Sequence, residues 1–176
     1  MIRIAIALLV ALSCLAGRAD AADSGTLACV NKGTPPALRE RIAGDLYAKF
    51  RTPGYVRDKS LSAELAMIAK ACRERHGWSN NATVAALLWT RTSIELPVAE
   101  KLASEDGWDV AAVWKAWRGE SIQVRTLELD PADLERVHKA LESAGATKLS
   151  HSEFIFGVLA GYIHANEYAK ALFLTS

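Results

Sequence analysis

The stretch FIFGVLAGYI, at residues 154–163, carries no charged side chain and no alternation of polar and apolar positions. A helix that is apolar on every face is stable only when other elements surround it, so this stretch predicts a central buried helix. The preceding Ser150-His151-Ser152-Glu153 has the pattern of a capping box, which predicts that a helix begins there. The run is too short to cross a bilayer, because a spanning helix needs about 20 apolar residues.

Small residues recur every four positions along the same helix, at Gly157, Gly161, Ala165 and Ala169. Such a ridge lets a second helix approach closely. Two interior glycines cost about 2 kcal/mol in helix propensity, so a close contact is expected to compensate them. Packing inside the core is the favoured interpretation, and a homodimer seam or a ligand slot through the same four residues is the alternative.

Helical periodicity continues upstream of this stretch. Apolar residues recur at helical spacing after Pro35-Pro36, from Leu61 to Cys72, after Asn80 or Asn81, after Asp109 and after Asp130-Pro131, and Pro97 is expected to restart a helix. Residues 121–129 instead alternate polar and apolar side chains, which predicts one short extended segment. The fold class is therefore all-α, a single compact domain of six or seven helices with one extended segment.

The N-terminal sequence has the pattern of a targeting segment. Arg3 precedes an apolar run, and Ala19-Asp20-Ala21 matches the small-x-small pattern of a cleavage site. We predict a signal peptide over residues 1–21, an irregular segment over 22–33 and the helical domain over 34–176. The short leader indicates a bacterial periplasmic protein. Secretion into the medium and lipoprotein processing at Cys14 are the alternatives.

Composition excludes several classes of protein. Hydrophobic residues make up 51% of the 176 residues and charged residues 23%, and the formal net charge is +1. These values exclude a disordered chain and a strongly basic nucleic-acid binder. The charges are unevenly distributed: residues 32–75 carry 10 Lys/Arg against 5 Asp/Glu, and residues 95–153 carry 7 against 12. Attraction between the two halves is the simplest interpretation, and a pair of oppositely charged partner surfaces is the other.

Cys29 and Cys72 are the two cysteines that remain after the predicted cleavage. In an oxidising compartment they can pair with each other, and we predict that disulfide. No Cys-x-x-Cys spacing indicates a redox-active thiol. Glu135 and His138 have the spacing of a di-iron helix, but one carboxylate and one imidazole do not complete a coordination shell. We therefore predict no metal site and no cofactor.

Five tryptophans fall between residues 78 and 117. Aromatic faces make good platforms for sugars and peptides, so Trp78, Trp108, Trp114 and Trp117 are candidates for a binding surface, with ordinary core packing as the alternative. His164 lies on the apolar helix and is the histidine expected to be buried. Glu167, three residues later, can share its helix face, so the two form a candidate buried polar site.

Two functions from different classes fit this sequence. The first is a binding or protein-interaction module of the cell envelope, whose partner is a protein, a peptide or a glycan. The second is a small envelope-directed hydrolase that uses paired carboxylates, with Glu95, Glu100 and Glu105 as acid/base candidates. The sequence contains no recognisable catalytic constellation, which favours the binding module.

Overall fold

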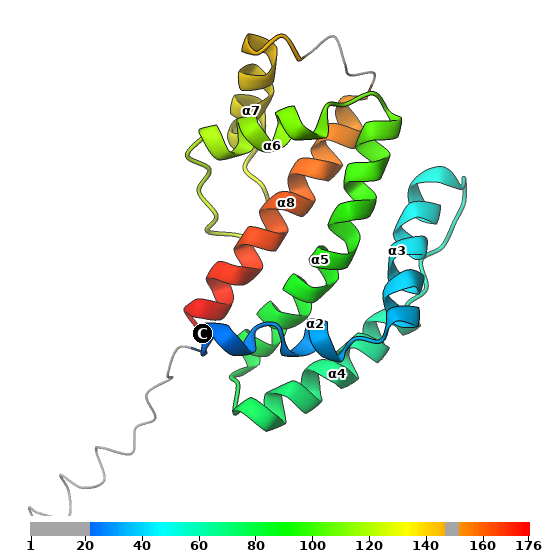
Figure 1. Ribbon diagram of the computed structural model, residues 1–176, viewed down its shortest axis with the longest axis vertical. Helices are drawn as coiled ribbons and strands as arrows, with labels where there is room; N and C mark the ends of the chain where they lie inside the picture. The colour runs from blue at the N-terminus through cyan, green and yellow to red at the C-terminus, as the bar shows by residue number, and fades with distance from the viewer. Residues whose placement is uncertain (1–21, 147–151) are drawn as a thin grey trace, which may run out of the picture.

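Two long helices, α5 (Asn80–Glu105) and α8 (Glu153–Leu174), run antiparallel through the centre of the molecule and make its most extensive contact (Figure 1). The computed structural model describes residues 22–146 and 152–176. The predicted signal peptide, Cys14 and His151 lie outside these described residues. The apolar stretch at 154–163 forms the first half of α8, and Leu159 and Ile163 are fully buried there. Each such side chain contributes about 1.5–3 kcal/mol of burial free energy.

The remaining helices pack around this pair (Figure 1). The short helix α2 (Cys29–Gly33) and α4 (Ser60–His76) lie at one end. Helix α3 (Pro36–Arg51) runs alongside α5, and its last turns reach Glu105 and Phe154. The other end carries α6 (Val110–Gly119) and α7 (Pro131–Ser143). Each end has its own apolar cluster, centred on Leu65 and Phe173 at the first and on Trp108 and Leu159 at the second. The prediction of an all-α domain with six or seven helices is confirmed within the described residues.

Local sequence signals explain where the helices begin and end. Asp109 and Asp130 cap α6 and α7 through their side chains, and Ser152 caps α8. Gly77 ends α4 with a positive φ of 66°, a conformation that glycine adopts without steric cost. The starts of α6 and α7 and the end of α4 agree with the sequence prediction. Helix α8 begins at Glu153 with Ser152 as its N-cap, two residues later than a capping box from Ser150 would place it.

Two predictions about the backbone are wrong. Residues 22–33 are not irregular, because they form a 3-10 turn, η2 (Ser24–Thr26), and α2. Pro97 does not restart a helix, since α5 continues through it while packed along α8. Residues 121–129 belong to no helix, as predicted, and no strand among the described residues pairs with them. The Thr126 carbonyl instead accepts a hydrogen bond from His164 Nε2, at 2.8 Å.

The glycine ridge of α8 is not closely packed within the chain. A Cβ atom added at Gly157 or Gly161 would meet no atom within 4 Å apart from the helix itself. The expected close helix approach in the core is therefore wrong for these two glycines. Ala169 is buried and Ala165 is half-buried. A homodimer through this ridge stays a prediction.

Candidate functional site

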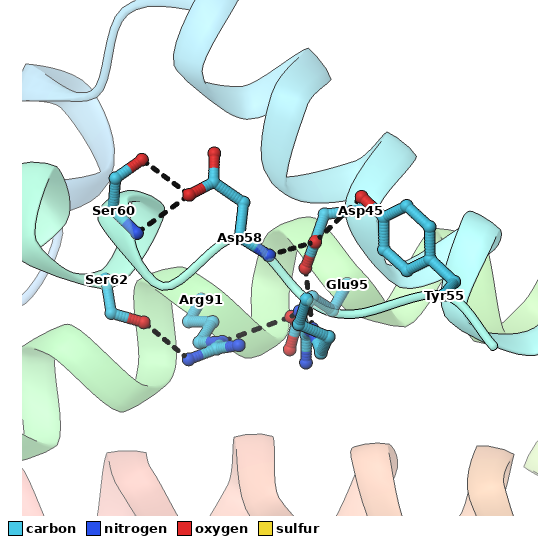
Figure 2. A network of polar contacts seen from close by, with 8 residues as sticks. Asp45, Tyr55, Asp58, Ser60, Ser62, Arg91 and Glu95 are labelled. Atoms are coloured by element: carbon cyan, nitrogen blue, oxygen red, sulfur yellow. Dashed lines mark hydrogen bonds and ion pairs between the residues drawn. The ribbon is translucent and has the colours of Figure 1, made fainter.

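A network of charged side chains joins α3, α5 and the connection between α3 and α4 (Figure 2). Arg57, in that connection, donates from Nε to Asp45 and from Nη2 to Glu95, both at 2.6 Å. Asp45 belongs to α3 and Glu95 to α5, and only 5% and 3% of their surfaces are exposed. Two acids that are far apart in sequence are thus bridged by one guanidinium group.

Further donors complete the network. Arg91 binds Glu95 from Nε at 3.1 Å and reaches Ser62 of α4 from Nη1, also at 3.1 Å. Asp45 accepts two more hydrogen bonds, from the Tyr55 hydroxyl at 3.1 Å and from the Asp58 backbone N–H at 2.8 Å. The result is a local balance of two buried carboxylates and two guanidinium groups.

The environment shifts the pKa values of several groups in this region, among them Asp45 and Tyr162. Burial by itself would raise the pKa of Asp45, but the Asp58 N–H and the Arg57 guanidinium outweigh it, so the pKa of Asp45 is lowered. Burial first, and then the charge of Glu95, raises the pKa of the Tyr162 hydroxyl on α8. Tyr162 therefore stays protonated, and Asp45 is ionised, at neutral pH.

The network has no room for a substrate. The hollow beside it, lined by residues that include Ile42, Arg57 and Arg91, has a volume of about 10 Å³. That volume holds one water molecule at most. A glycosidase-type site needs a cleft between two carboxyl groups. Here the space between Asp45 and Glu95 is filled by Arg57, so the arrangement is suited to holding the α3–α4 connection in place.

The other two acid/base candidates, Glu100 and Glu105, are also held by hydrogen bonds or ion pairs. Glu100 accepts a hydrogen bond from Trp114 Nε1 at 2.7 Å. Glu105 pairs with Arg51 at 2.9 Å and accepts a hydrogen bond from Tyr47. Burial opposes the ionisation of Glu105, but these donors outweigh it and its pKa is lowered. A lowered pKa does not suit a general acid at neutral pH.

The predicted tryptophan surface is mostly core. Trp78, Trp108 and Trp117 are each at most 6% exposed, and Trp114 is half-buried. Trp108 stacks on Phe156 with ring centroids 4.8 Å apart. This placement favours the ordinary packing that the sequence also allowed, because a buried ring offers no face to a ligand.

His164 and Glu167, the two residues of the predicted buried polar site, lie in different environments. His164 is 1% exposed, donates from Nε2 to the Thr126 carbonyl and packs near Trp117. Glu167 is half-exposed and pairs with Lys170 at 2.7 Å. The structure therefore confirms the burial of His164, whereas Glu167 faces away as half of a surface ion pair.

The Glu135 and His138 pair lines a separate hollow of about 350 Å³, together with Glu153 and Phe156. Glu135 forms an ion pair with Lys139 at 3.4 Å. Within the described part of the chain, no three His, Cys, Asp or Glu side chains are arranged to hold a metal ion.

A larger groove lies between α4 and the segment formed by η2 and α2. The predicted disulfide is present: Cys29 and Cys72 are bonded, with their Cα atoms 6.0 Å apart, and the bridge joins α2 to the last turns of α4. Gly33 allows a close approach at the same place, since a Cβ atom there would lie 3.1 Å from Ile68. The groove above this junction has a volume of about 710 Å³.

This α2–α4 groove has an apolar floor and a basic rim. The floor is formed by the disulfide, Ile68 and Gly33, and Met67 lies exposed at the edge. The exposed side chains of the rim are Lys32, Arg75 and His76. Among the residues that the structure describes, no carboxylate forms an ion pair with Lys32 or Arg75.

Trp78 connects the groove to the core. Its ring stacks on His76 with centroids 5.5 Å apart, and its Nε1 donates to the Thr26 hydroxyl at 3.0 Å. His76 and Thr26 both line the groove. Trp78 also packs edge-on against Phe173, which is fully buried. The walls of the groove are therefore held by a covalent bond on one side and by a buried aromatic residue on the other.

Comparisons with known protein families, with curated proteins and with solved structures find no match for this chain. No described helix combines the length and the apolar character needed to cross a membrane.

Proposed function

We propose that this chain is a binding module of the bacterial cell envelope, and that it holds a small organic ligand in the α2–α4 groove. The observation that carries the proposal is the groove itself, a hollow of about 710 Å³ whose walls are fixed by the Cys29–Cys72 disulfide. Ligand sites commonly measure about 300–1,000 Å³ and combine an apolar lining with a few polar groups. The groove has both properties.

The envelope location rests on two features. The N-terminal sequence has the pattern of a signal peptide, and the disulfide is stable in an oxidising compartment such as the periplasm. The hydrolase alternative has less support, because Glu95, Glu100 and Glu105 are each held by a cation or an indole N–H.

Native mass spectrometry of the protein purified from its host's envelope tests this function. We expect a bound mass that dissociates when the protein unfolds. The Ala71→Trp variant should lose that mass, because Ala71 is exposed in the groove and an indole there fills the space. Ala66→Trp is the matched control: it makes the same substitution at an exposed position of α4 that does not line the groove. A bound mass that Ala71→Trp retains would contradict the proposal.

A further inference from the structure

The rim of the α2–α4 groove carries two cations, Lys32 and Arg75, that form no ion pair with any carboxylate of the described residues. Lys32 lies on α2 and Arg75 on α4, and both line the groove although they are distant in sequence. Arg51, Arg57 and Arg91, by contrast, all pair with carboxylates. Positive charge left without a partner beside a concave surface favours an anionic ligand.

The apolar part of the groove sets a second requirement. Met67 is 68% exposed, an unusual position for a methionine, and Ile68 and the disulfide continue the apolar surface inward. Methionine adapts its shape to irregular apolar ligands. A simple inorganic anion would leave this surface in contact with water, whereas a ligand with a hydrocarbon tail would cover it.

We propose that the ligand of the α2–α4 groove is a free single-chain amphiphile with an anionic head, such as a fatty-acid carboxylate. Lys32 and Arg75 bind the head, while Met67 and Ile68 contact the tail. Arg75 can hold a carboxylate through two parallel N–H donors. This inference rests on the proposed function and specifies the chemical class of its ligand.

Isothermal titration calorimetry with decanoate tests the ligand class, and monodecanoylglycerol provides the same tail without charge. We expect decanoate to bind, and Arg75→Gln and Lys32→Gln to weaken that binding at least about tenfold, the effect of losing one charge-assisted hydrogen bond. Arg73→Gln is the matched control. The substitution removes the same charge from an exposed position on the same helix, but Arg73 does not line the groove. Its affinity should stay within about twofold of the unsubstituted protein. Ala71→Trp should abolish binding.

Other results would overturn the inference in distinguishable ways. Equal affinity for monodecanoylglycerol, with no effect of Arg75→Gln, would refute the anionic head and leave the groove's binding function standing. Binding to anionic phospholipid vesicles without binding to decanoate would identify a membrane surface as the partner instead. In a further outcome, decanoate fails to bind although native mass spectrometry detects a bound ligand that is absent from the Ala71→Trp variant. That result would reject this ligand class alone. If decanoate does not bind and native mass spectrometry detects no ligand, the proposed function is rejected as well.

Discussion

The charged network around Arg57 and the α2–α4 groove both involve helix α4, but they differ in whether their charged side chains are paired. The network contacts the first turn of α4 through Ser60 and Ser62, whereas residues within 67–76 of the same helix line the groove. In the network, Arg57 and Arg91 are matched by Asp45 and Glu95, and the adjacent hollow holds one water at most. At the groove, Lys32 and Arg75 have no carboxylate partner among the described residues, and the space is about 710 Å³. A closed network whose charges are all paired stabilises the fold, whereas an open groove with unpaired cations can accept an anionic ligand.

The disulfide is the strongest single constraint on the groove side of this comparison. Replacing both Cys29 and Cys72 with serine should lower the free energy of unfolding by about 4 kcal/mol on the chain-entropy model, because the bridge closes a loop with a sequence separation of 43. Urea unfolding of the oxidised protein and of the double variant measures the difference. A loss below about 1 kcal/mol would mean that the N-terminal segment is held mainly by packing.

Arg57→Met is the corresponding test of the network. The variant leaves two buried carboxylates without their shared partner, and breaking a buried pair in this way costs about 3 kcal/mol or more. Arg41→Met is the control, since Arg41 forms exposed, solvent-screened ion pairs with Asp58 and Glu64 and its replacement should cost much less stability. Equal losses in the two variants, measured by urea unfolding, would remove the distinction between buried and surface pairs.

The network should also make the free energy of unfolding depend on pH in the acid range. The folded protein lowers the pKa of Asp45 from its ordinary value of 3.8. The resulting stabilisation is complete above that value and is lost as pH falls through the lower, folded-state pKa. Thermal unfolding between neutral pH and strong acid should therefore bring the Asp45→Asn variant and the unsubstituted protein closer together as pH falls. A constant gap between them would show that Asp45 does not titrate as described.

The smallest effect is expected at the rim of the groove. Arg75→Gln should change the free energy of unfolding by less than about 0.5 kcal/mol, because the side chain is exposed and has no partner in the described chain. The same variant is expected to weaken decanoate binding strongly. A large loss of stability, measured by urea unfolding, would place Arg75 among the structural residues instead.

The sequence predicted the helices well because their signals are local. The apolar run at 154–163, the Asp109 and Asp130 caps and the Gly77 stop depend on neighbouring residues alone. Pro97 was misread for a physical reason: the long contact with α8 maintains α5 through a residue that usually ends a helix. The glycine ridge was misread because periodicity does not tell whether a neighbouring helix lies against it.

The network and the groove were harder to predict because both depend on residues distant in sequence. A signal existed for Asp45, a charged residue on the same face of α3 as the apolar Leu38 and Ile42. No local pattern, however, indicated that Arg57 would bridge Asp45 to Glu95. The Cys29–Cys72 pairing was predicted, and it is confirmed, but the groove that it creates with Lys32 and Arg75 was not.

The uneven charge of the sequence is now partly accounted for. Arg51 and Arg57, from the basic half, pair with Glu105 and Glu95 of the acidic half. These two pairs are direct attractions between the halves. Lys32 and Arg75 are basic residues that this attraction does not use.

Chemical-shift mapping by ¹⁵N NMR during titration with decanoate locates the binding site on the protein. We expect the backbone signals of Lys32, Gly33, Ala71 and Arg75, around the α2–α4 groove, to shift, while those of Asp45 and Glu95 stay in place. Shifts centred on Asp45, Arg57 and Glu95 would contradict this expectation, because they would make the closed network the binding site and leave the groove without a ligand.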